Sequence, residues 1–569
     1  MNTPKSLYNK WKKFFLINLL VGVFSFFMLI SLQLLNHLDA IWHYGYGGAG
    51  NWERGLGRWF LPYVDKLRFG LLTDPFCNVL ALAIFILGNI VVFETIGWAP
   101  DKFRTYAVSF IFLISTSTGV WLSFRYTSDG YAIAYLFAVL TVYMCRFGVK
   151  SPKLPHKLLT ATVNTKEASN AKEAPNAKES PNTKEATNTA DSIFSVILAS
   201  VCLMLSLGSY QAFFDSTCLV MLLTFMLMLY KNEDTKELLS FFLRSVISII
   251  CGAILYFIGM KLTFAKYGIE GLNSYNEGDS LGIFNSILNI PDTIGTTIHY
   301  FREYFFSTVF RWNRLQENPV FRIFICILII ATLITAIVRL FRKNRVFAIL
   351  FTLCALLLPI ATNVVLFVAT ESYLSIQMTN GLALFLFVMF VLMFEILTTD
   401  EIHTTHCRRM LLQKVVNATV IAASVLVIYG NYISVQIDQE ACREGTTGTV
   451  TLASEMLDSL KNLGYADKGG KVCFVGTPCH NERFMYSEIY PMANNLMQFG
   501  NWGKSASTHG QTWIGIYREH LGYFVETCSD EEYEKITARP DVAAMPMYPR
   551  AGSITEIDGI IVIKVSNDY

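Results

Sequence analysis

Charged residues are scarce in this chain of 569 amino acids. Only 16% of the residues are Asp, Glu, Lys or Arg, whereas 53% are hydrophobic. A soluble protein of this size carries about a quarter charged residues. Lys and Arg form no basic block, and the formal net charge is only +2, so nothing indicates a nucleic-acid partner. The composition therefore predicts a membrane protein that contacts lipid.

Signatures of soluble enzymes are also missing. The sequence contains no phosphate-binding loop, no dinucleotide-binding fingerprint, no nucleophile elbow and no HExxH zinc motif. Most of the 12 cysteines lie in or beside apolar runs, where they act as small apolar residues. The C-terminal part holds Cys442, Cys473, Cys479 and Cys528, an even number that permits disulfides in an exported segment. The spacing of Cys473 and Cys479 beside His480 is too unspecific to predict zinc.

Apolar runs long enough to cross a bilayer recur along the chain. A membrane-spanning helix needs about 20 residues. The first run lacks a small-residue cleavage site and is longer than the apolar core of a signal peptide, about 7–15 residues, so we expect an anchoring helix there. We expect about eleven transmembrane helices, at 14–35, 76–97, 105–124, 131–149, 193–209, 213–230, 240–260, 321–338, 346–369, 380–397 and 415–437.

The distribution of Lys and Arg predicts an orientation. They gather in alternate connections, at 1–13, 98–104, 339–345 and 398–414, which we therefore place in the cytoplasm together with the N-terminus. Eleven spans then put the C-terminal part outside the cell. One outer segment, 36–75, breaks this pattern because it also holds several basic residues. Contact with lipid headgroups explains them as well as a specific function does.

The spans divide the chain into four parts. We expect a first membrane module at 1–149 with a catalytic outer loop at 36–75, a disordered cytoplasmic linker at 150–190, a second membrane module at 191–437 with a long outer loop at 261–320, and an extracytoplasmic tail at 438–569. The linker contains the polar repeat "NTKEASNAKEAPNAKESPNTKEATNTA", which cannot build a core. In the tail, Leu452, Met456, Leu460 and Leu463 recur at helical spacing, and "KVCFVG" and "GIIVIKVS" are typical of buried strands. The expected fold is an all-α polytopic membrane protein with a small α/β appendage.

Polar groups that could carry chemistry lie at the outer helix ends. A sugar transfer that inverts the anomeric centre needs a carboxylate near the acceptor hydroxyl. It also needs positive charge near the departing phosphate. Both kinds of group occur among Asp39, Arg54, Arg58, Asp65, Arg68, Asp74, Arg125, Asp129, Gln211, Asp215 and Glu371.

Two motifs on this face are similar to those of a known family. Asp39 is followed by "WHYGYGGAGNWE" and then by Gly57-Arg58-Trp59, and "SLGSYQAF" begins at residue 206. In this order they resemble the bacterial Gtr-type II glucosyltransferases, which belong to the multi-helix GT-C class. The resemblance covers the membrane portion, is faint in the tail and is absent from the linker. It implies polyprenyl-phosphate glucose as donor and a cell-surface glycan, such as an O-antigen or a teichoic acid, as acceptor.

The resemblance also implies roles for individual residues. The acid of the first outer loop serves catalysis, and here it is Asp39. Many members have a second acid beside it, where this chain has Ala40, so Asp129 is our candidate for a second carboxylate. The expected substrate-binding residues are Arg54, Arg58, Trp59, Arg68, Tyr210 and Gln211.

Each of these residues also has a purely structural interpretation. Asp39 and Asp129 could cap helices, the arginines could reach lipid phosphates, the aromatic residues could form an interfacial belt, and Tyr210 and Gln211 could pack between helices. A flippase for lipid-linked glycans would line its midplane with charges, whereas the midspan regions here are almost uncharged. A glycan polymerase or ligase shares the setting and stays open as an alternative. No cofactor is certain, and a divalent metal ion is left open.

Overall fold

The computed structural model describes residues 4–32, 34, 47–148, 181–271, 290–307, 310–367, 374–398, 407–465, 469–502 and 506–569, but not the side chains at 4–5, 181–190, 407–410 and 506–508. The expected catalytic residue Asp39 lies outside the described residues, as do residues 150–180 of the expected linker. The last residues of that linker, 181–190, belong to the first turns of a helix.

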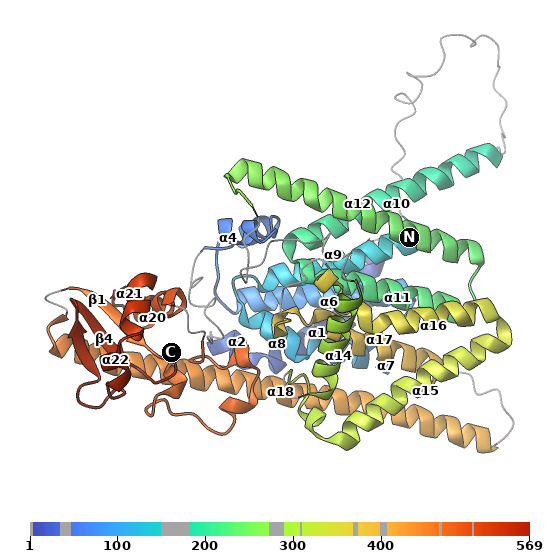
Figure 1. Ribbon diagram of the computed structural model, residues 1–569. Coiled ribbons are helices and arrows are strands. Elements are labelled where there is room, and N and C mark those ends of the chain that lie inside the picture. The colour runs from blue at the N-terminus through green and yellow to red at the C-terminus, as the bar shows by residue number, and fades with distance from the viewer. Residues whose placement is uncertain are drawn as a thin grey trace, which may run out of the picture.

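The molecule consists of a body of long helices and a smaller part with a sheet (Figure 1). The end of the body that lies nearer the sheet is here called the tail-side end, and the opposite end is called the far end. The helices of the body are α1 (Pro4–Ser25), α2 (Phe27–Leu32), α4 (Asn51–Gly55), α5 (Leu61–Lys66), α6 (Phe76–Ile96), α7 (Phe103–Leu113), α8 (Thr116–Ser123), α9 (Ser128–Phe147), α10 (Pro181–Ser209), α11 (Phe214–Tyr230), α12 (Thr235–Tyr267), α14 (Ile290–Phe306), α15 (Pro319–Lys343), α16 (Arg345–Ala361), α17 (Asn380–Ile396) and α18 (Cys407–Asn462).

Seven helices among the described residues are long and apolar enough to span a membrane, or eight if the bent pair α7 and α8 is one span. The expected count of about eleven is therefore not confirmed. The three remaining apolar runs form α1 with α2, α16 and α17. The helices α16 and α17 have 17 residues each, which is at the lower limit for a span. The run at 346–369 falls short because α16 ends at Ala361, two residues after Pro359, and a 3-10 helix, η3 (Val364–Phe367), follows.

Several long helices turn an apolar stripe to the outside of the body. A soluble protein would cover such a stripe, whereas a lipid bilayer solvates it. On α12 and α15 the exposed apolar side chains recur every three or four residues: Ile250, Ile254, Ile258 and Leu262 on the first, and Ile323, Ile327, Ile330 and Ile334 on the second. These stripes favour a body embedded in a membrane.

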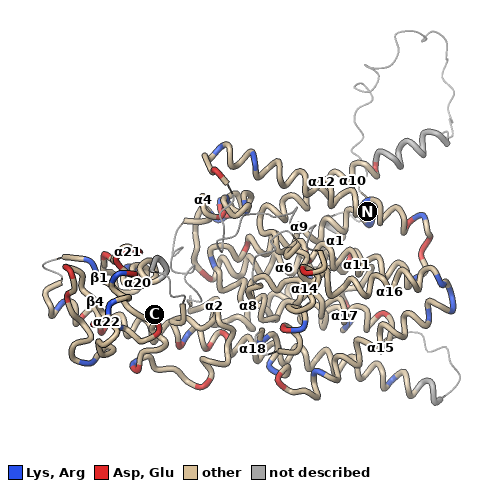
Figure 2. The backbone as a smooth tube through the Cα atoms, in the orientation of Figure 1, with Lys and Arg blue, Asp and Glu red and all other residues tan. Residues whose placement is uncertain are grey.

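Ion pairs tie the helices together at the far end. Glu395 at the end of α17 accepts a hydrogen bond of 2.6 Å from the indole of Trp98 and lies 3.3 Å from Arg104 and 3.9 Å from Lys231. Glu94 on α6 pairs with Lys10 of α1. Figure 2 shows that the turn between α15 and α16, rich in Lys and Arg, also lies at this end. Lys10 and the basic connections at 98–104 and 339–345 thus share one end of the body.

The last helix joins the body to the tail. α18 has 56 residues and a length of roughly 84 Å, far more than the ~30 Å hydrocarbon core of a bilayer. Its final turns contribute Leu452, Met456 and Leu460 to the core of the tail, which confirms the helical spacing predicted for them, whereas Leu463 lies beyond the helix and is exposed. The tail is therefore fixed to the body by a continuous helix.

The tail contains a sheet of four strands in the order β2-β1-β4-β3. The predicted strands are confirmed as β1 (Lys471–Val475) and β4 (Ile560–Lys564), which pair in parallel. The other two are β2 (Glu526–Thr527), parallel to β1, and β3 (Ile554–Ile557), antiparallel to β4. The helices α20 (Ala506–Leu521), α21 (Asp530–Thr537) and α22 (Pro540–Ala544) accompany the sheet.

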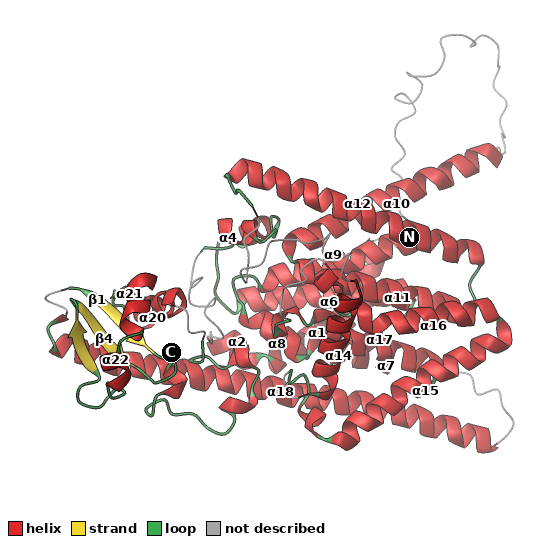
Figure 3. Cartoon of the chain, viewed as in Figure 1, coloured by secondary structure: helices red, strands yellow, loops and turns green. Residues whose placement is uncertain are grey.

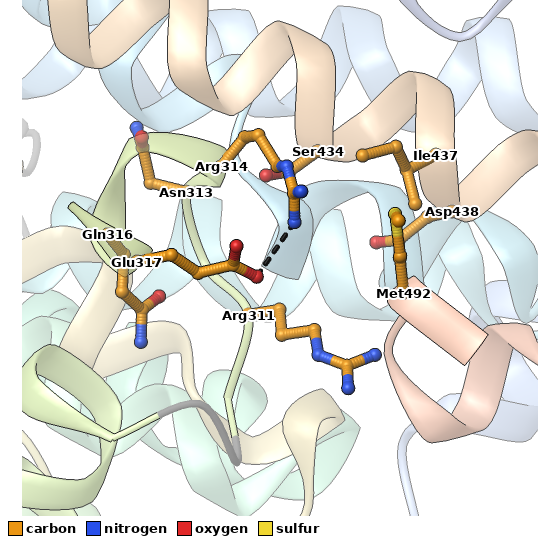
Figure 4. Close-up of a pocket in the computed structure, with 9 residues that line it drawn as sticks. All are labelled: Arg311, Asn313, Arg314, Gln316, Glu317, Ser434, Ile437, Asp438 and Met492. Atoms are coloured by element: carbon orange, nitrogen blue, oxygen red, sulfur yellow. Dashed lines mark hydrogen bonds and ion pairs between the residues drawn. The ribbon is translucent and has the colours of Figure 1, made fainter. Parts of the chain in front are cut away.

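A polar junction holds the tail against the body. Arg311 donates hydrogen bonds to the carbonyl groups of Pro491 and Ala493, and Asn494 donates a backbone hydrogen bond of 2.9 Å to Asp438 of α18. Figure 4 shows Arg311, Asp438 and Met492 around a small cavity at this junction, which the ion pair between Arg314 and Glu317 also borders. The junction holds residues 491–494 of the tail close to the body.

Candidate functional site

The segment from Gly47 to Pro75 folds against the tail-side ends of α9, α10 and α12. It forms two short helices, α4 and α5, separated by a turn at Gly57, which adopts a φ of +79°. The backbone N–H of Phe60 donates a 2.8 Å hydrogen bond to the carbonyl of Gly208 at the end of α10. The side chain of Gln211 donates a 2.7 Å hydrogen bond to the carbonyl of Leu56. These two hydrogen bonds hold the loop against the end of α10 and the segment that follows it.

Trp59 anchors the loop between α10 and α12. Its side chain is 9% exposed and forms an apolar cluster with Tyr256, Met260 and Phe264 of α12. A Cβ atom at Gly208 or Gly259 would lie within 3 Å of the indole ring. Two glycines therefore make room for this ring, whose contacts are those of a packing residue.

Arg58, Tyr210 and Gln211 meet beside this anchor. The guanidinium of Arg58 lies 4.4 Å from the centre of the Tyr210 ring, a cation–π distance. Tyr210 in turn packs edge-on against Tyr131 of α9. Gln211 also donates a 3.0 Å hydrogen bond to the hydroxyl of Tyr256. Three predicted substrate-binding residues from two distant sequence motifs are therefore neighbours.

Arg68 is buried between two carboxylates. Its Nε atom lies 2.9 Å from the Oδ2 atom of Asp129, at the start of α9, and its Nη2 atom pairs with Asp65. Nη2 also donates a 2.6 Å hydrogen bond to the carbonyl of Tyr126. Arg68 is only 2% exposed, so these contacts hold it inside the protein, away from lipid phosphates.

Asp65 forms the charged wall of a hollow next to Arg68. Its Oδ2 atom accepts a 2.5 Å hydrogen bond from the backbone N–H of Ala49. Burial raises the pKa of Asp65 above its usual value, although the nearby Arg68 and the Ala49 N–H act against that shift. Gly48 lies so close that a Cβ atom there would be 2.7 Å from Oδ2. The glycine-rich stretch thus lets the backbone reach this carboxylate.

The hollow has a volume of about 690 Å³. Two cationic side chains, Arg54 and Lys66, border it. The guanidinium of Arg54 lies 4.1 Å from the ring centre of Tyr267, at the end of α12, and Lys66 and Lys266 act electrostatically on the same tyrosine. The lining consists of Gly47, Gly48, Ala49, Arg54, Pro62, Asp65, Lys66, Phe69 and Gly70.

This arrangement can hold an anion beside a carboxylate. A phosphate fits the positive side formed by Arg54 and Lys66, and Asp65 faces the same space. Of the predicted site residues, Arg54 lines the hollow, Arg68 and Asp129 lie behind its wall, and Arg58, Trp59, Tyr210 and Gln211 pack the loop in place. Asp39 precedes Gly47, the first described residue of this loop, by eight positions.

Sequence reasoning gave no role to Asp65, Lys66 or Phe69. The signal for the first was present, because Asp65 is one of the acids on the outer loop, but its contact with Ala49 is not visible in a linear pattern. The described residues contain no group of three or more His, Cys, Asp or Glu side chains that could hold a metal ion.

Comparison with known proteins bears on the membrane portion. No curated protein and no solved structure matches the chain. The family described as Glucosyl transferase GtrII matches residues 27–396, which is more than half of the chain and includes the hollow and both motifs. The match ends with α17, so that α18 and the tail lie beyond it. The chain therefore belongs to the GtrII glucosyl transferase family, which implies that it is a glucosyltransferase.

Proposed function

We propose that this protein moves glucose from a polyprenyl-phosphate donor to a cell-surface glycan at the hollow beside Asp65. The observation that carries the proposal is the hollow itself, which is lined by the carboxylate Asp65 and by the cations Arg54 and Lys66, in the loop that follows Asp39. A lipid-linked donor suits this position because the loop lies at the ends of membrane-spanning helices, where a lipid phosphate would be found.

The proposed reaction needs a base and a site for the leaving group. Asp39 takes the proton of the acceptor hydroxyl, whose oxygen forms the new bond to the anomeric carbon as the bond to the donor phosphate breaks. The leaving group is polyprenyl phosphate, and Arg54 and Lys66 stabilise its charge. Arg58, with Tyr210 and Gln211, keeps the loop in register with α10 and α12. No protein group changes its charge permanently, since the proton passes on to water.

We assign a positioning role to Arg68 and Asp129. Both are buried, and their ion pair of 2.9 Å holds the guanidinium that pairs with Asp65. Asp129 therefore acts on the hollow through Arg68, and Asp65 takes the place that we had predicted for Asp129, that of a second carboxylate near the substrate. Loss of Arg68 would leave the buried carboxylate of Asp129 without this ion pair, and loss of Asp129 would leave Arg68 with Asp65 as its remaining ion-pair partner.

The proposal includes an orientation. We place the tail-side end outside the cell and the far end, with its basic connections, in the cytoplasm. The domains proposed are the two membrane modules at 1–149 and 191–437, the cytoplasmic linker at 150–190 and the extracytoplasmic tail at 438–569.

The test is an assay of the purified protein with polyprenyl-phosphate glucose and isolated cell-surface glycan. The proposal expects release of polyprenyl phosphate and addition of one hexose to the acceptor, measured by mass. Addition of a whole repeat unit from a diphosphate-linked donor would indicate a polymerase or ligase instead. Movement of the lipid-linked sugar across a vesicle membrane without transfer would indicate a flippase.

A further inference from the structure

Phe69 is the most exposed large apolar side chain of the described residues at the hollow, with 87% of its surface accessible. Leu67, two positions earlier in the sequence, is exposed as well. A phenylalanine in this position gains nothing from packing inside the protein. Phe69 lines the hollow together with the cation Lys66, and the two exposed side chains Leu67 and Phe69 are here called the apolar lip.

The backbone at Phe69 takes an unusual conformation. Its φ is +54°, in the left-handed region that favours glycine and disfavours bulky side chains. The turn is fixed from the inside, because the backbone N–H of Arg68 donates to the carbonyl of Asp65 and that of Phe69 donates to the carbonyl of Lys66. The buried side chain of Arg68 therefore points inward while the next residue, Phe69, is turned outward.

Cationic side chains line the same hollow as Phe69. Arg54 and Lys66 border the hollow, and Lys266 lies 5.2 Å from the ring centre of Tyr267, the ring against which Arg54 packs. A ligand that satisfies both features has an anionic group followed at once by an apolar chain. A lipid phosphate has this chemistry, whereas a free sugar phosphate lacks the chain and an ordinary glycan lacks both.

We propose that Leu67 and Phe69 contact the first isoprene units of the donor lipid while its phosphate lies against Arg54 and Lys66. This inference rests on the proposed function and adds the place at which the lipid chain is recognised. The lip then makes the enzyme prefer a donor with an isoprene chain, because a donor without one makes no contact with the two side chains.

The test compares two glucose donors, a full-length polyprenyl phosphate and a short donor in which a methyl group replaces the whole isoprene chain. In Phe69→Gly the side chain is lost while the backbone is relieved, since glycine adopts the positive φ without strain. We expect kcat/KM for the long donor to fall about tenfold, the equivalent of ~1.4 kcal/mol of lost contact, and the value for the short donor to stay within twofold. Thermal stability should remain equal or increase.

A matched control changes an exposed phenylalanine elsewhere. Phe524 lies in the tail and is also exposed, and Phe524→Gly should leave the preference for the long donor unchanged. Equal losses for both donors in Phe69→Gly, or no loss for either, would overturn the inference.

A binding measurement separates this inference from the proposed function. Polyprenyl phosphate, the expected product, should bind wild type more tightly than Phe69→Gly, with the difference absent for methyl phosphate, which has no isoprene chain. If wild type binds polyprenyl phosphate more tightly than Phe69→Gly does but transfers no glucose, the proposed function is refuted and the role of the lip in lipid binding is supported. If both proteins bind it equally, the lip is refuted whatever the activity.

Discussion

Arg68 lies between Asp65 and Asp129 and forms an ion pair with each of them. From the sequence we expected Arg68 at the level of lipid phosphates, as one of four basic residues of the outer loop. The structure pairs it with an acid that lies far away in the sequence, on α9. A pattern of residue types shows that acids and arginines share a face, but it does not show which of them neutralise each other.

A substitution at Gly48 tests whether the position of the Asp65 carboxylate matters for transfer. A Cβ atom there would lie 2.7 Å from Asp65 Oδ2, and φ at this position is +149°. Gly48→Ala should displace the carboxylate and reduce the rate of transfer by about 10- to 100-fold, as small misplacements near a reacting centre do. Gly295→Ala serves as control, because nothing lies within 4 Å of its Cβ. Equal initial rates for the two variants would show that the hollow is not the site.

Asp74 predicts a pH dependence of stability. Burial raises the pKa of Asp74 to about 7, against the opposing influence of Arg125, whereas an unfolded aspartate has a pKa of about 3.9. At a pH between these two pKa values, Asp74 therefore holds a proton in the folded state that it has lost in the unfolded state. The contribution of Asp74 to the free energy of unfolding is therefore complete below about pH 4 and is lost as the pH rises to about 7.

Thermal unfolding in detergent measures this effect. Wild type should lose stability between pH 5 and pH 7 relative to Asp74→Asn, which cannot titrate and which retains an acceptor for the hydrogen bond from Asn78. Parallel pH profiles for the two proteins would mean that Asp74 titrates normally.

At the scale of elements, the apolar runs predicted the positions of the long helices but not their ends. Pro359 and the short 3-10 helix after it explain why the run at 346–369 yields a helix of only 17 residues. The arrangement of α4 and α5 was beyond prediction for another reason. It depends on contacts with α10 and α12, such as the hydrogen bond from Gln211 to Leu56, and a linear pattern contains no such contacts.

The close packing of Trp59 against Gly208 and Gly259 predicts how the loop and α12 depend on each other for stability. In Gly259→Ala the new methyl group would lie 2.7 Å from the indole, so α12 and the loop must move apart, at a cost of about 1–3 kcal/mol. Trp59→Phe removes the atoms that would clash, and the double variant should therefore recover part of the lost stability. Strictly additive losses in thermal unfolding would show that the two positions do not touch.

At the scale of the whole molecule, basic connections and the tail lie at opposite ends of the body. The ion pairs of Glu395 and Glu94 gather the basic connections at the far end, while the tail lies at the opposite end (Figure 2). The sequence predicted this separation from the positions of Lys and Arg, although its count of eleven spans is not confirmed.

Accessibility of single cysteines on intact cells tests the orientation. An impermeant reagent should label a cysteine placed at exposed Phe524 in the tail and should not label one placed at exposed Lys343, in the basic turn at the end of α15. A cysteine in the 150–190 linker should be labelled only after the cells are opened. Labelling of the linker but not of the tail on intact cells would invert the proposed topology.

The central claim is that Asp39 acts as the base for glucose transfer at the hollow, and Asp39→Asn tests it most directly. Asparagine keeps the size of the side chain but cannot accept the proton, and general base catalysis is typically worth about 10²–10⁴-fold. The measurement is the initial rate of polyprenyl phosphate release in proteoliposomes, with donor binding measured in parallel. We predict a loss of that size with unchanged donor binding. A rate within a few-fold of wild type would contradict the claim and direct attention to Asp65.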